Sequence, residues 1–246
     1  MTRETHEDNP MTTYYKVLNL NGTTYHGGTG KWHLPHDGQP GHGAWMPALD
    51  ESKLSPCKYG YHILEEGDLV YWLGPAIFTV EYRGKIVRDK DKGVVGRARL
   101  LKHMPTWNEM TARLFAADCA EHVLAHFEGR YPLDLRPRQA IETARRYARG
   151  EATIEHLSAA ASAADRAAYS AADSAAYRAA YSAAYSAAAS AVASAAYSAA
   201  YSAAYSAAYW AAASAADRAA ASAAASAERA WQTARLMEYL NGALAA

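Results

Sequence analysis

The chain has 246 residues, and its 25 Lys and Arg residues balance its 25 Asp and Glu residues. This balance excludes the strong positive field that attracts nucleic acid, so we expect no nucleic-acid partner. The two cysteines, Cys57 and Cys119, are too few for a disulfide framework and are typical of a reducing cytoplasm. The start is polar and no run of 18 strongly apolar residues occurs, so we expect a cytoplasmic protein without a membrane partner.

Residues 11–105 have the pattern of a β-rich N-terminal domain. Short apolar runs alternate with turn signals, and the stretch is rich in Gly, Pro, Tyr, Trp and His. Residues 12–20 predict a strand that ends in a turn at Asn21-Gly22. Residues 77–89 predict two strands around a turn at Arg83-Gly84, and residues 94–103 predict another strand. We therefore expect a small sheet with long loops.

Residues 106–157 predict amphipathic helices. Apolar residues recur at helical spacing over residues 107–128, with Asn108 or Thr106 as N-cap and Gly129 at the end. A second helix follows over residues 134–149, with Gly150 as its C-cap. Residues 152–158 open a third.

Residues 158–228 repeat the tetrad Ala-Ala-Tyr-Ser, which predicts helix because alanine is the best helix former. Four residues turn an α-helix by about 400°, so the Tyr stripe winds around the helix and an ordinary coiled coil is not indicated. The Ala-Ala slots favour close helix crossings, so we expect stacked helices, with one long rod as the alternative. Residues 229–246 would form a C-terminal helix or cap. Packing or assembly would then depend on the large side chains of the repeat: Tyr177, Tyr181, Tyr185, Tyr197, Tyr201, Tyr205, Tyr209 and Trp210.

The fold class predicted from these segments is α+β, with a small β-rich domain followed by an all-α, Ala-rich tetrad-repeat region. Two groups of residues within it could carry chemistry.

The first group lies in the Gly-rich loops of residues 25–62: His26, Trp32, His33, His36, Trp45, Cys57 and His62. His33 and His36 could bind zinc, although their spacing matches no standard pattern. The GGTG stretch could hold a small ligand or nucleotide by stacking and hydrogen bonds, although the phosphate-loop spacing is absent. Cys57 could be a nucleophile with His62 or His26 as base. The alternative without a site is a loop packed over the sheet, and we predict no cofactor.

The second group lies on the predicted helices. Asp118, His122 and His126 are four residues apart and share a helix face, which is a weak metal pattern or a solvated face. Five arginines could form a positive patch for an acidic partner, or a solvated face: Arg136, Arg138, Arg145, Arg146 and Arg149.

Residues 107–153 resemble bacterial and phage proteins of the Imm-5-like immunity kind. The resemblance rests on Asp118-Cys119-Ala120-Glu121, Asp134, Arg136-Pro137-Arg138, the helix of residues 140–149 and Gly150. It implies binding of a partner rather than catalysis, and it supplies no catalytic residue. The first half contains YHGGTGKWHLP, CKYGYHILEEGDLVYWLGP and GRARLL, and it resembles an uncharacterised domain that precedes such helices in actinobacterial and phage proteins. Together the two resemblances cover residues 14–160 by motif and the remainder by composition.

We therefore expect a non-catalytic, cytoplasmic protein-binding or scaffold protein with a role in bacterial or phage conflict. In this interpretation the N-terminal loops recognise a ligand or protein, and the helices provide shape. One alternative is a self-assembling structural protein that forms homo-oligomers through the tetrad helices. Another is an enzyme or nucleotide binder that uses the N-terminal loops.

Overall fold

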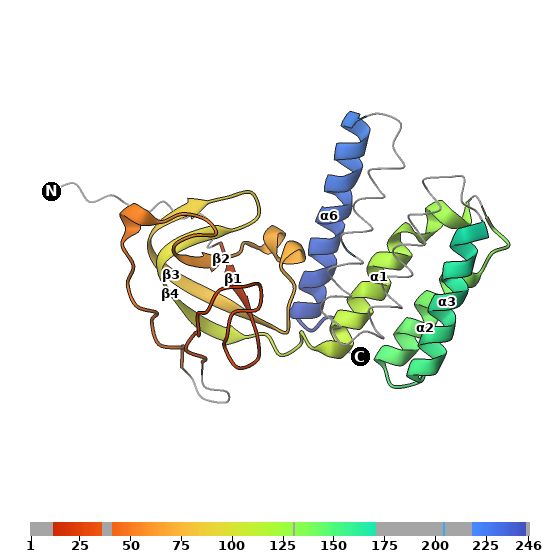
Figure 1. Cartoon of the computed structure of the whole chain (residues 1–246), viewed down its shortest axis with the longest axis horizontal. Helices are drawn as coiled ribbons and strands as arrows, with labels where there is room; N and C mark the ends of the chain where they lie inside the picture. Colours follow the sequence, from red (N-terminus) through yellow and green to blue (C-terminus); the bar gives the residue numbers. More distant parts are fainter. Residues whose placement is uncertain (1–11, 36–40, 130, 171–203, 205–217, 245–246) are drawn as a thin grey trace.

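The computed structural model describes residues 12–35, 41–129, 131–170, 204 and 218–244. The N-terminal half is a curled antiparallel sheet, and the C-terminal half is a group of helices beside it (Figure 1). The Tyr and Trp residues of the tetrad repeat, Tyr177 to Trp210, lie outside the described residues. What we expect of their packing therefore stays a prediction.

The sheet contains β1 (Tyr14–Leu18), β2 (Tyr61–Ile63), β3 (Ala76–Arg88) and β4 (Gly93–His103), in the order β1-β3-β4-β2. Each neighbouring pair is antiparallel. The sheet curls so far that its two edges meet. At the meeting point the backbones of Tyr15 and Leu64 exchange hydrogen bonds of 2.8 and 2.9 Å. The result is a half-barrel that is pinned at this bridge.

The predicted turn at Arg83-Gly84 is wrong, because residues 76–88 form a single strand. The pairing of β3 with β4 shifts between Arg83 and Ile86, as in a β-bulge, and Gly84 has a φ of 83° there. A glycine with left-handed φ suits a turn and a bulge equally well, so the sequence signal was ambiguous. The chain actually reverses at residues 89–92, where Asp89 N donates to Lys92 O at 2.9 Å.

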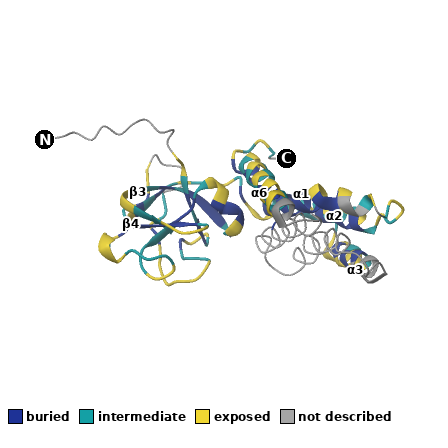
Figure 2. Ribbon diagram, turned by 90° about the horizontal axis from the view of Figure 1, so that it is seen from above, coloured by how far each residue is buried: buried dark blue, intermediate teal, exposed yellow. Residues whose placement is uncertain are grey.

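The described helices are α1 (Glu109–Glu128), α2 (Arg136–Ala148), α3 (Ile154–Ser170) and α6 (Arg218–Leu240). Two short 3₁₀ helices, η1 (Glu51–Lys53) and η2 (Glu66–Tyr71), precede β2 and β3. α2 packs between α1 and α3, and α6 packs against both α1 and η2 (Figures 1 and 2). The last helix of the chain therefore returns to the half-barrel.

The predicted helix caps at both ends of this region are confirmed. Asn108 Oδ1 accepts hydrogen bonds from the backbone N–H of Met110 and Thr111 at 3.0 and 3.2 Å, which satisfies the first turn of α1. Gly150 ends α2 with a φ of 76° and donates to Tyr147 O. Glu151 N donates to Arg146 O, which completes a Schellman motif.

One hydrophobic cluster joins the half-barrel to the helices. It contains Tyr15, Val17, Leu69 and Ile77 from the half-barrel, and Phe115, Leu124, Leu236 and Leu240 from the helices. Trp107 is fully buried in this cluster, and its Nε1 donates to Gly74 O at 2.8 Å. A second cluster fills the half-barrel with Leu18, Trp32, Ile63, Phe78, Val95 and Leu100. Buried surface thus continues from the sheet into α1 and α2 (Figure 2).

These observations correct the predicted fold class. The chain is broadly α+β, and its N-terminal part is a curled antiparallel half-barrel over residues 14–103, a curvature that the predicted small sheet with long loops did not include. The helical part is not an Ala-rich rod, because α1, α2 and the end of α6 build their core from large side chains such as Phe115, Leu124 and Leu236. Alanine periodicity dominated the sequence pattern, whereas these less regular segments determine the packing. Within the described residues, none of the helices combines the length and apolarity needed to cross a membrane.

Candidate functional site

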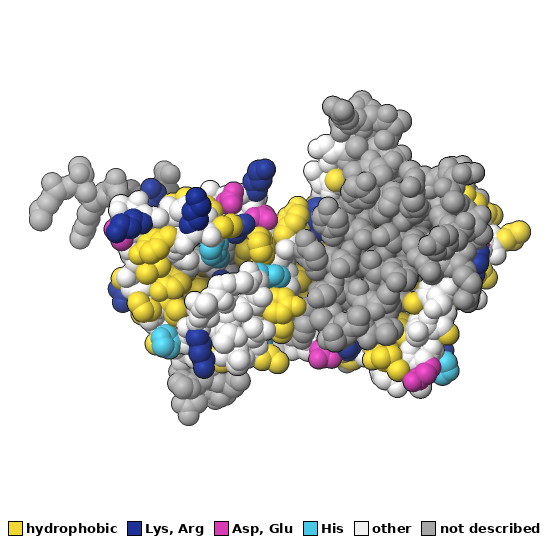
Figure 3. All heavy atoms as spheres, in the orientation of Figure 1, with side chains coloured by type: hydrophobic (Ala, Val, Ile, Leu, Met, Phe, Trp, Pro, Cys, Tyr) yellow, Lys and Arg dark blue, Asp and Glu magenta, His cyan; other side chains and the backbone are white. Residues whose placement is uncertain are grey.

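A cavity of about 380 Å³ opens in the half-barrel, between β1, β2, the Gly-rich loop and the end of η2. Aromatic rings form much of its wall: Tyr25, His26, Trp32, Tyr61, His62 and Trp72. Of the described residues that line it, three are lysines and none is acidic. The face of the half-barrel seen in Figure 3 exposes hydrophobic side chains and histidines next to one another. The cavity is therefore aromatic, open to solvent and positively charged.

Four of the predicted site residues meet in this cavity. His26, Trp32, Cys57 and His62 come from three separate segments and line it together. His33 is exposed and does not line the cavity, and His36 lies outside the described residues. The expected His33 and His36 zinc pair is therefore not tested by the structure.

Trp45 belongs to a different surface. Its ring is covered by the guanidinium groups of Arg83, Arg97 and Arg99, at 4.6, 5.4 and 4.8 Å from the ring centroid. Stacking of this kind anchors the loop of residues 41–50 on the outside of β3 and β4. Trp45 therefore has a packing role and does not contribute to the cavity.

Cys57 and His62 are neighbours, but not in the arrangement that a nucleophile needs. The backbone N–H of Cys57 donates to Nε2 of His62 at 2.9 Å, so that ring nitrogen is an acceptor and cannot take a proton from the thiol at the same time. Burial, assisted by the charges of Lys16 and Lys92, lowers the pKa of His62 to about 4. Cys57 itself has a φ of 61°, a backbone conformation rare for a non-glycine residue. The pair therefore has a structural role. The neutral His62 ring accepts the hydrogen bond of the Cys57 amide and so stabilises the left-handed backbone conformation of Cys57.

His26 fastens the Gly-rich loop to the end of η2. Its Nε2 lies 2.9 Å from Trp72 O and 3.0 Å from Leu73 O, so it donates to these carbonyls. Its ring packs edge-on against Tyr25 and Trp72. Desolvation lowers the pKa of His26. The ring is thus a neutral donor and not a free base.

The GGTG stretch is a short hairpin loop and not a phosphate loop. Gly27 and Gly28 have φ values of 91° and 82°, and the Thr23–Lys31 bridge closes the loop behind them. No helix follows it, since residues 32–35 are extended or irregular. A nucleotide site of the phosphate-loop type therefore lacks its helix N-terminus here.

Sequence reasoning missed the three lysines that line the cavity, of which Lys16 and Lys92 lie over its tryptophan rings. Lys16 Nζ donates to His62 O at 2.9 Å and lies 5.1 Å from the Trp32 ring centroid. Lys92 Nζ lies 4.5 Å from the Trp72 ring centroid and pairs with Asp91 at 3.0 Å. One sequence signal for an inward-facing Lys16 was available. Lys16 lies in the predicted strand of residues 12–20, where every second side chain faces the same side of the sheet.

In the helical region Asp118 is the centre of a buried ion network. Its carboxylate accepts from Arg145 Nη2 at 2.7 Å, from Arg235 Nε at 2.8 Å and from the Tyr239 hydroxyl at 2.7 Å. Desolvation, together with the charge of Asp118, raises the pKa of Tyr239 well above its ordinary value. Asp118 thus ties α2 and α6 to α1, and it is not available to a metal.

His122, which belongs to the weak metal pattern predicted on α1, is also bound to other side chains of the protein. Its Nδ1 lies 2.7 Å from Glu228 Oε2, and its ring stacks on Trp231 with centroids 3.8 Å apart. The side chain of His126 is outside the described residues. Across the part of the chain that the structure describes, no three His, Cys, Asp or Glu side chains gather as metal ligands would.

The arginines of α2 do not form an open positive patch. Arg138 pairs with Glu128 through bonds of 2.7 and 2.6 Å, and Arg145 pairs with Asp118 and Glu121. These carboxylates remove most of the charge that an acidic partner would need. The acids that pair with Arg138 and Arg145 come from α1, and these pairs favour the solvated helix face over the patch for an acidic partner. A role of the arginines in binding an acidic partner stays a prediction.

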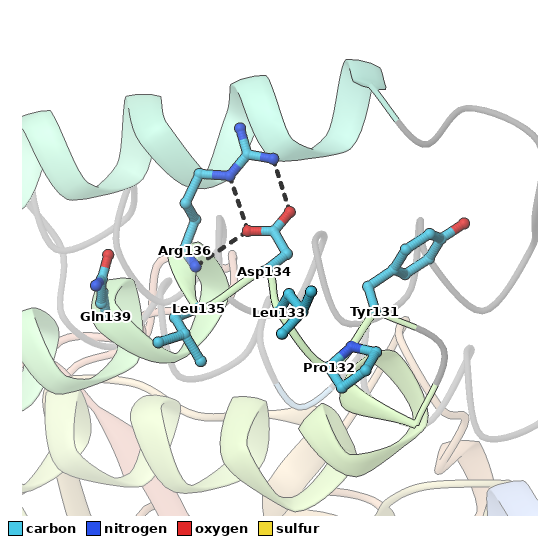
Figure 4. Close-up of a pocket in the computed structure, with 7 residues that line it drawn as sticks. All are labelled: Tyr131, Pro132, Leu133, Asp134, Leu135, Arg136 and Gln139. Atoms are coloured by element: carbon cyan, nitrogen blue, oxygen red, sulfur yellow. Dashed lines mark hydrogen bonds and ion pairs between the residues drawn. The ribbon is translucent and has the colours of Figure 1, made fainter.

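The connection between α1 and α2 exposes apolar side chains instead. The side chains of Leu133 and Leu135 are 96% and 51% exposed, and they line an open hollow with Tyr131, Pro132 and Gln139. Asp134 and Arg136 point toward one another beside them and form two bonds of 2.8 and 2.6 Å (Figure 4). This bidentate pair fixes the backbone on both sides of Leu135. We call residues 131–136 the α1–α2 loop.

A family model described as Imm-5 like putative immunity protein matches residues 102–239, more than half of the chain. The chain belongs to this immunity protein family. The resemblance of the helical part to this family is confirmed, and the resemblance of the N-terminal part stays a prediction. The Imm-5 like part contains the Asp118 network, the His122–Trp231 stack and the α1–α2 loop, whereas the half-barrel cavity lies outside it. Comparisons with curated proteins and with solved structures find no match for this chain.

Proposed function

We propose that the protein is a non-catalytic binding protein with an immunity-related role, and that it holds a protein partner on the α1–α2 loop. The observation that carries this proposal is the exposure of Leu133 and Leu135, at 96% and 51%, within the family-matched region. Large apolar side chains that are exposed together are typical of protein–protein contact sites.

The surroundings of the loop support the same function. Charged side chains of α1, α2 and α6 pair with one another: Arg145 of α2 and Arg235 of α6 both bind Asp118 of α1. These ion pairs hold the three helices in a fixed arrangement, which we call the helical frame. A frame of this kind presents the loop without a conformational cost on binding, which favours affinity. The partner surface that fits is apolar with a polar rim able to face the paired Asp134 and Arg136.

A cytoplasmic setting is part of the proposal. Cys57 and Cys119 are both free, one exposed and one buried, and free exposed thiols persist in reducing compartments. Self-association through the tetrad repeat stays a prediction, because its tyrosines lie outside the described residues.

The test uses the proteins encoded beside this gene. Each neighbouring protein that inhibits the growth of a host is expressed in that host together with the full chain. We expect the chain to restore growth against one of them and to form a complex with it. Changing both Leu133 and Leu135 to Asp should weaken that complex at least about tenfold, because two apolar contacts are replaced by desolvated charges. The matched control is Leu20→Asp, since Leu20 is 66% exposed on the half-barrel.

Restored growth with the double variant, at the affinity of the original chain, would place the contact elsewhere and refute the loop assignment. Failure to restore growth against any neighbouring gene product would refute the immunity role itself.

A further inference from the structure

The half-barrel cavity contains a lysine in a place where strands normally put apolar residues. Successive residues of β1 face opposite sides, so Lys16 shares a face with Leu18, which belongs to the half-barrel interior. Its register partner on β3 is Phe78, another interior residue. Lys16 therefore points into the half-barrel, and it lines the cavity there.

Within the described part of the chain, Lys16 has no carboxylate to balance its charge. Among the described residues, no acidic side chain pairs with Lys16, and its bonds go to the carbonyl of His62 and to the face of Trp32. Burial lowers the pKa of Lys16 to about 8. A partly buried ammonium group without a counter-ion is less stable than a paired one. Lys16 is therefore placed to bind an anion that the described residues do not supply.

The walls around Lys16 have the form of a site for a flat molecule. The indole of Trp72 and the ring of Tyr61 line the same cavity as Trp32, and their faces and edges offer stacking contacts. Lys92 adds a second positive charge next to Trp72, although Asp91 and Asp89 partly neutralise it at 3.0 and 3.8 Å. A volume of about 380 Å³ is within the range of small-ligand sites, which often lie in the mouths of barrels.

We propose that this cavity binds a small planar anion, with its ring against Tyr61 and Trp72 and its anionic group at Lys16 Nζ. The ligand class is an aromatic carboxylate or phosphate. The site lies in the half-barrel, outside the family-matched residues, so the proposal stands independently of the partner surface on the α1–α2 loop.

The test is calorimetric titration of the full chain with matched probes: naphthoate, naphthyl phosphate, the neutral naphthalenemethanol, and acetate or inorganic phosphate as ringless anions. We expect at least one aromatic anion to bind, and both the neutral alcohol and the ringless anions to bind at least about tenfold more weakly. The tighter of the two aromatic anions identifies the carboxylate or phosphate source.

Three variants separate binding from folding. Lys16→Met should weaken the aromatic anion at least about tenfold while it leaves the melting temperature of the free protein unchanged or raised, since it removes a partly buried charge that no described carboxylate pairs with. Trp72→Leu should weaken binding by removing a stacking wall. Lys90→Met is the control, because Lys90 is exposed in the same turn as Lys92 and does not line the cavity.

The proposal is overturned if neither aromatic anion binds the folded chain, or if Lys16→Met binds both as tightly as the original chain. A lower melting temperature of Lys16→Met with unchanged anion binding would likewise overturn it, because Lys16 would then be a structural residue.

Discussion

His62 illustrates how the environment of a single residue decides its chemistry. In the sequence it stands five positions from Cys57 and suggests a base next to a thiol. In the structure its Nε2 accepts the Cys57 amide at 2.9 Å, and the surrounding atoms and two lysines oppose its protonation. A histidine held neutral in this way contributes stability only while it stays neutral.

The stability of the protein should therefore fall in a particular pH window. The pKa of His62 is about 4 in the folded chain and 6.5 in the unfolded chain, so the unfolded state binds more protons between these values. The contribution of His62 to the free energy of unfolding is complete above pH 6.5 and decreases as the pH falls toward 4. The His62→Gln variant keeps an acceptor for the Cys57 amide but does not titrate. Urea unfolding at several pH values should show a smaller pH dependence for this variant, and an unchanged dependence would show that His62 is not the group responsible.

The residue types that line the cavity could be predicted from the sequence, but the fact that they line the same cavity could not. Aromatic and imidazole groups are concentrated around glycines in this part of the sequence, and this pattern predicted four residues of the cavity: His26, Trp32, Cys57 and His62. Whether they converge depends on loop paths, and the same pattern also drew in Trp45, which stacks under arginines on another face. Lys16 was not predicted as a site residue because a single lysine in a strand is common. The alternation of residues 14–18 places it on one face of the strand, and the register with Phe78 shows that this face is the interior one.

At the scale of single elements, Gly84 has a measurable role in β3. It adopts a φ of 83° inside the strand, and an added Cβ there would collide with the Glu51 side chain. We expect Gly84→Ala to destabilise the fold by about 1–3 kcal/mol, through backbone strain and the displaced Glu51. Gly67→Ala is the matched control, because nothing lies within 4 Å of its added Cβ. Chemical denaturation of both variants measures the difference, and equal stability would mean that the bulge tolerates a side chain.

Elements whose signals are local were predictable, and elements that depend on pairing were not. The helices after residue 106 follow from periodicity, and their caps from Asn108 and Gly150, since each signal acts within a few residues. The long strand β3 was divided in two because its continuity depends on pairing with β4 across the bulge. Curling of the sheet is a property of four strands together, which no single stretch of sequence displays.

At the scale of the molecule, the half-barrel and the helices are one hydrophobic unit held by polar ties. Asp118 on α1 binds Arg235 and Tyr239 on α6, which are more than a hundred positions away in the chain. Trp107 binds the Gly74 carbonyl from inside the cluster that joins both halves. Disturbing this region should therefore affect both halves together.

We expect Asp118→Asn to lower the free energy of unfolding by about 3 kcal/mol, because it removes the charge that compensates Arg145 and Arg235. Helix circular dichroism and Trp fluorescence should shift to the same lower denaturant concentration. Glu109→Gln is the control, since its pair with Arg113 is on the surface and its side chain is 68% exposed, so the change should cost less than about 0.5 kcal/mol. Loss of the helix signal at a lower denaturant concentration than the fluorescence change would show that the two halves unfold separately.

The bridge between Tyr15 and Leu64 has a consequence for the behaviour of the protein at high concentration. An edge strand with unpaired amides is a template on which another chain can add a strand, and this is a common route to aggregation. Here the edges of β1 and β2 bond to one another at this point, through hydrogen bonds of 2.8 and 2.9 Å. The half-barrel thereby shields part of its own edge, and loosening the bridge, for example with Leu64→Pro, should appear first as fibrous or amorphous precipitation.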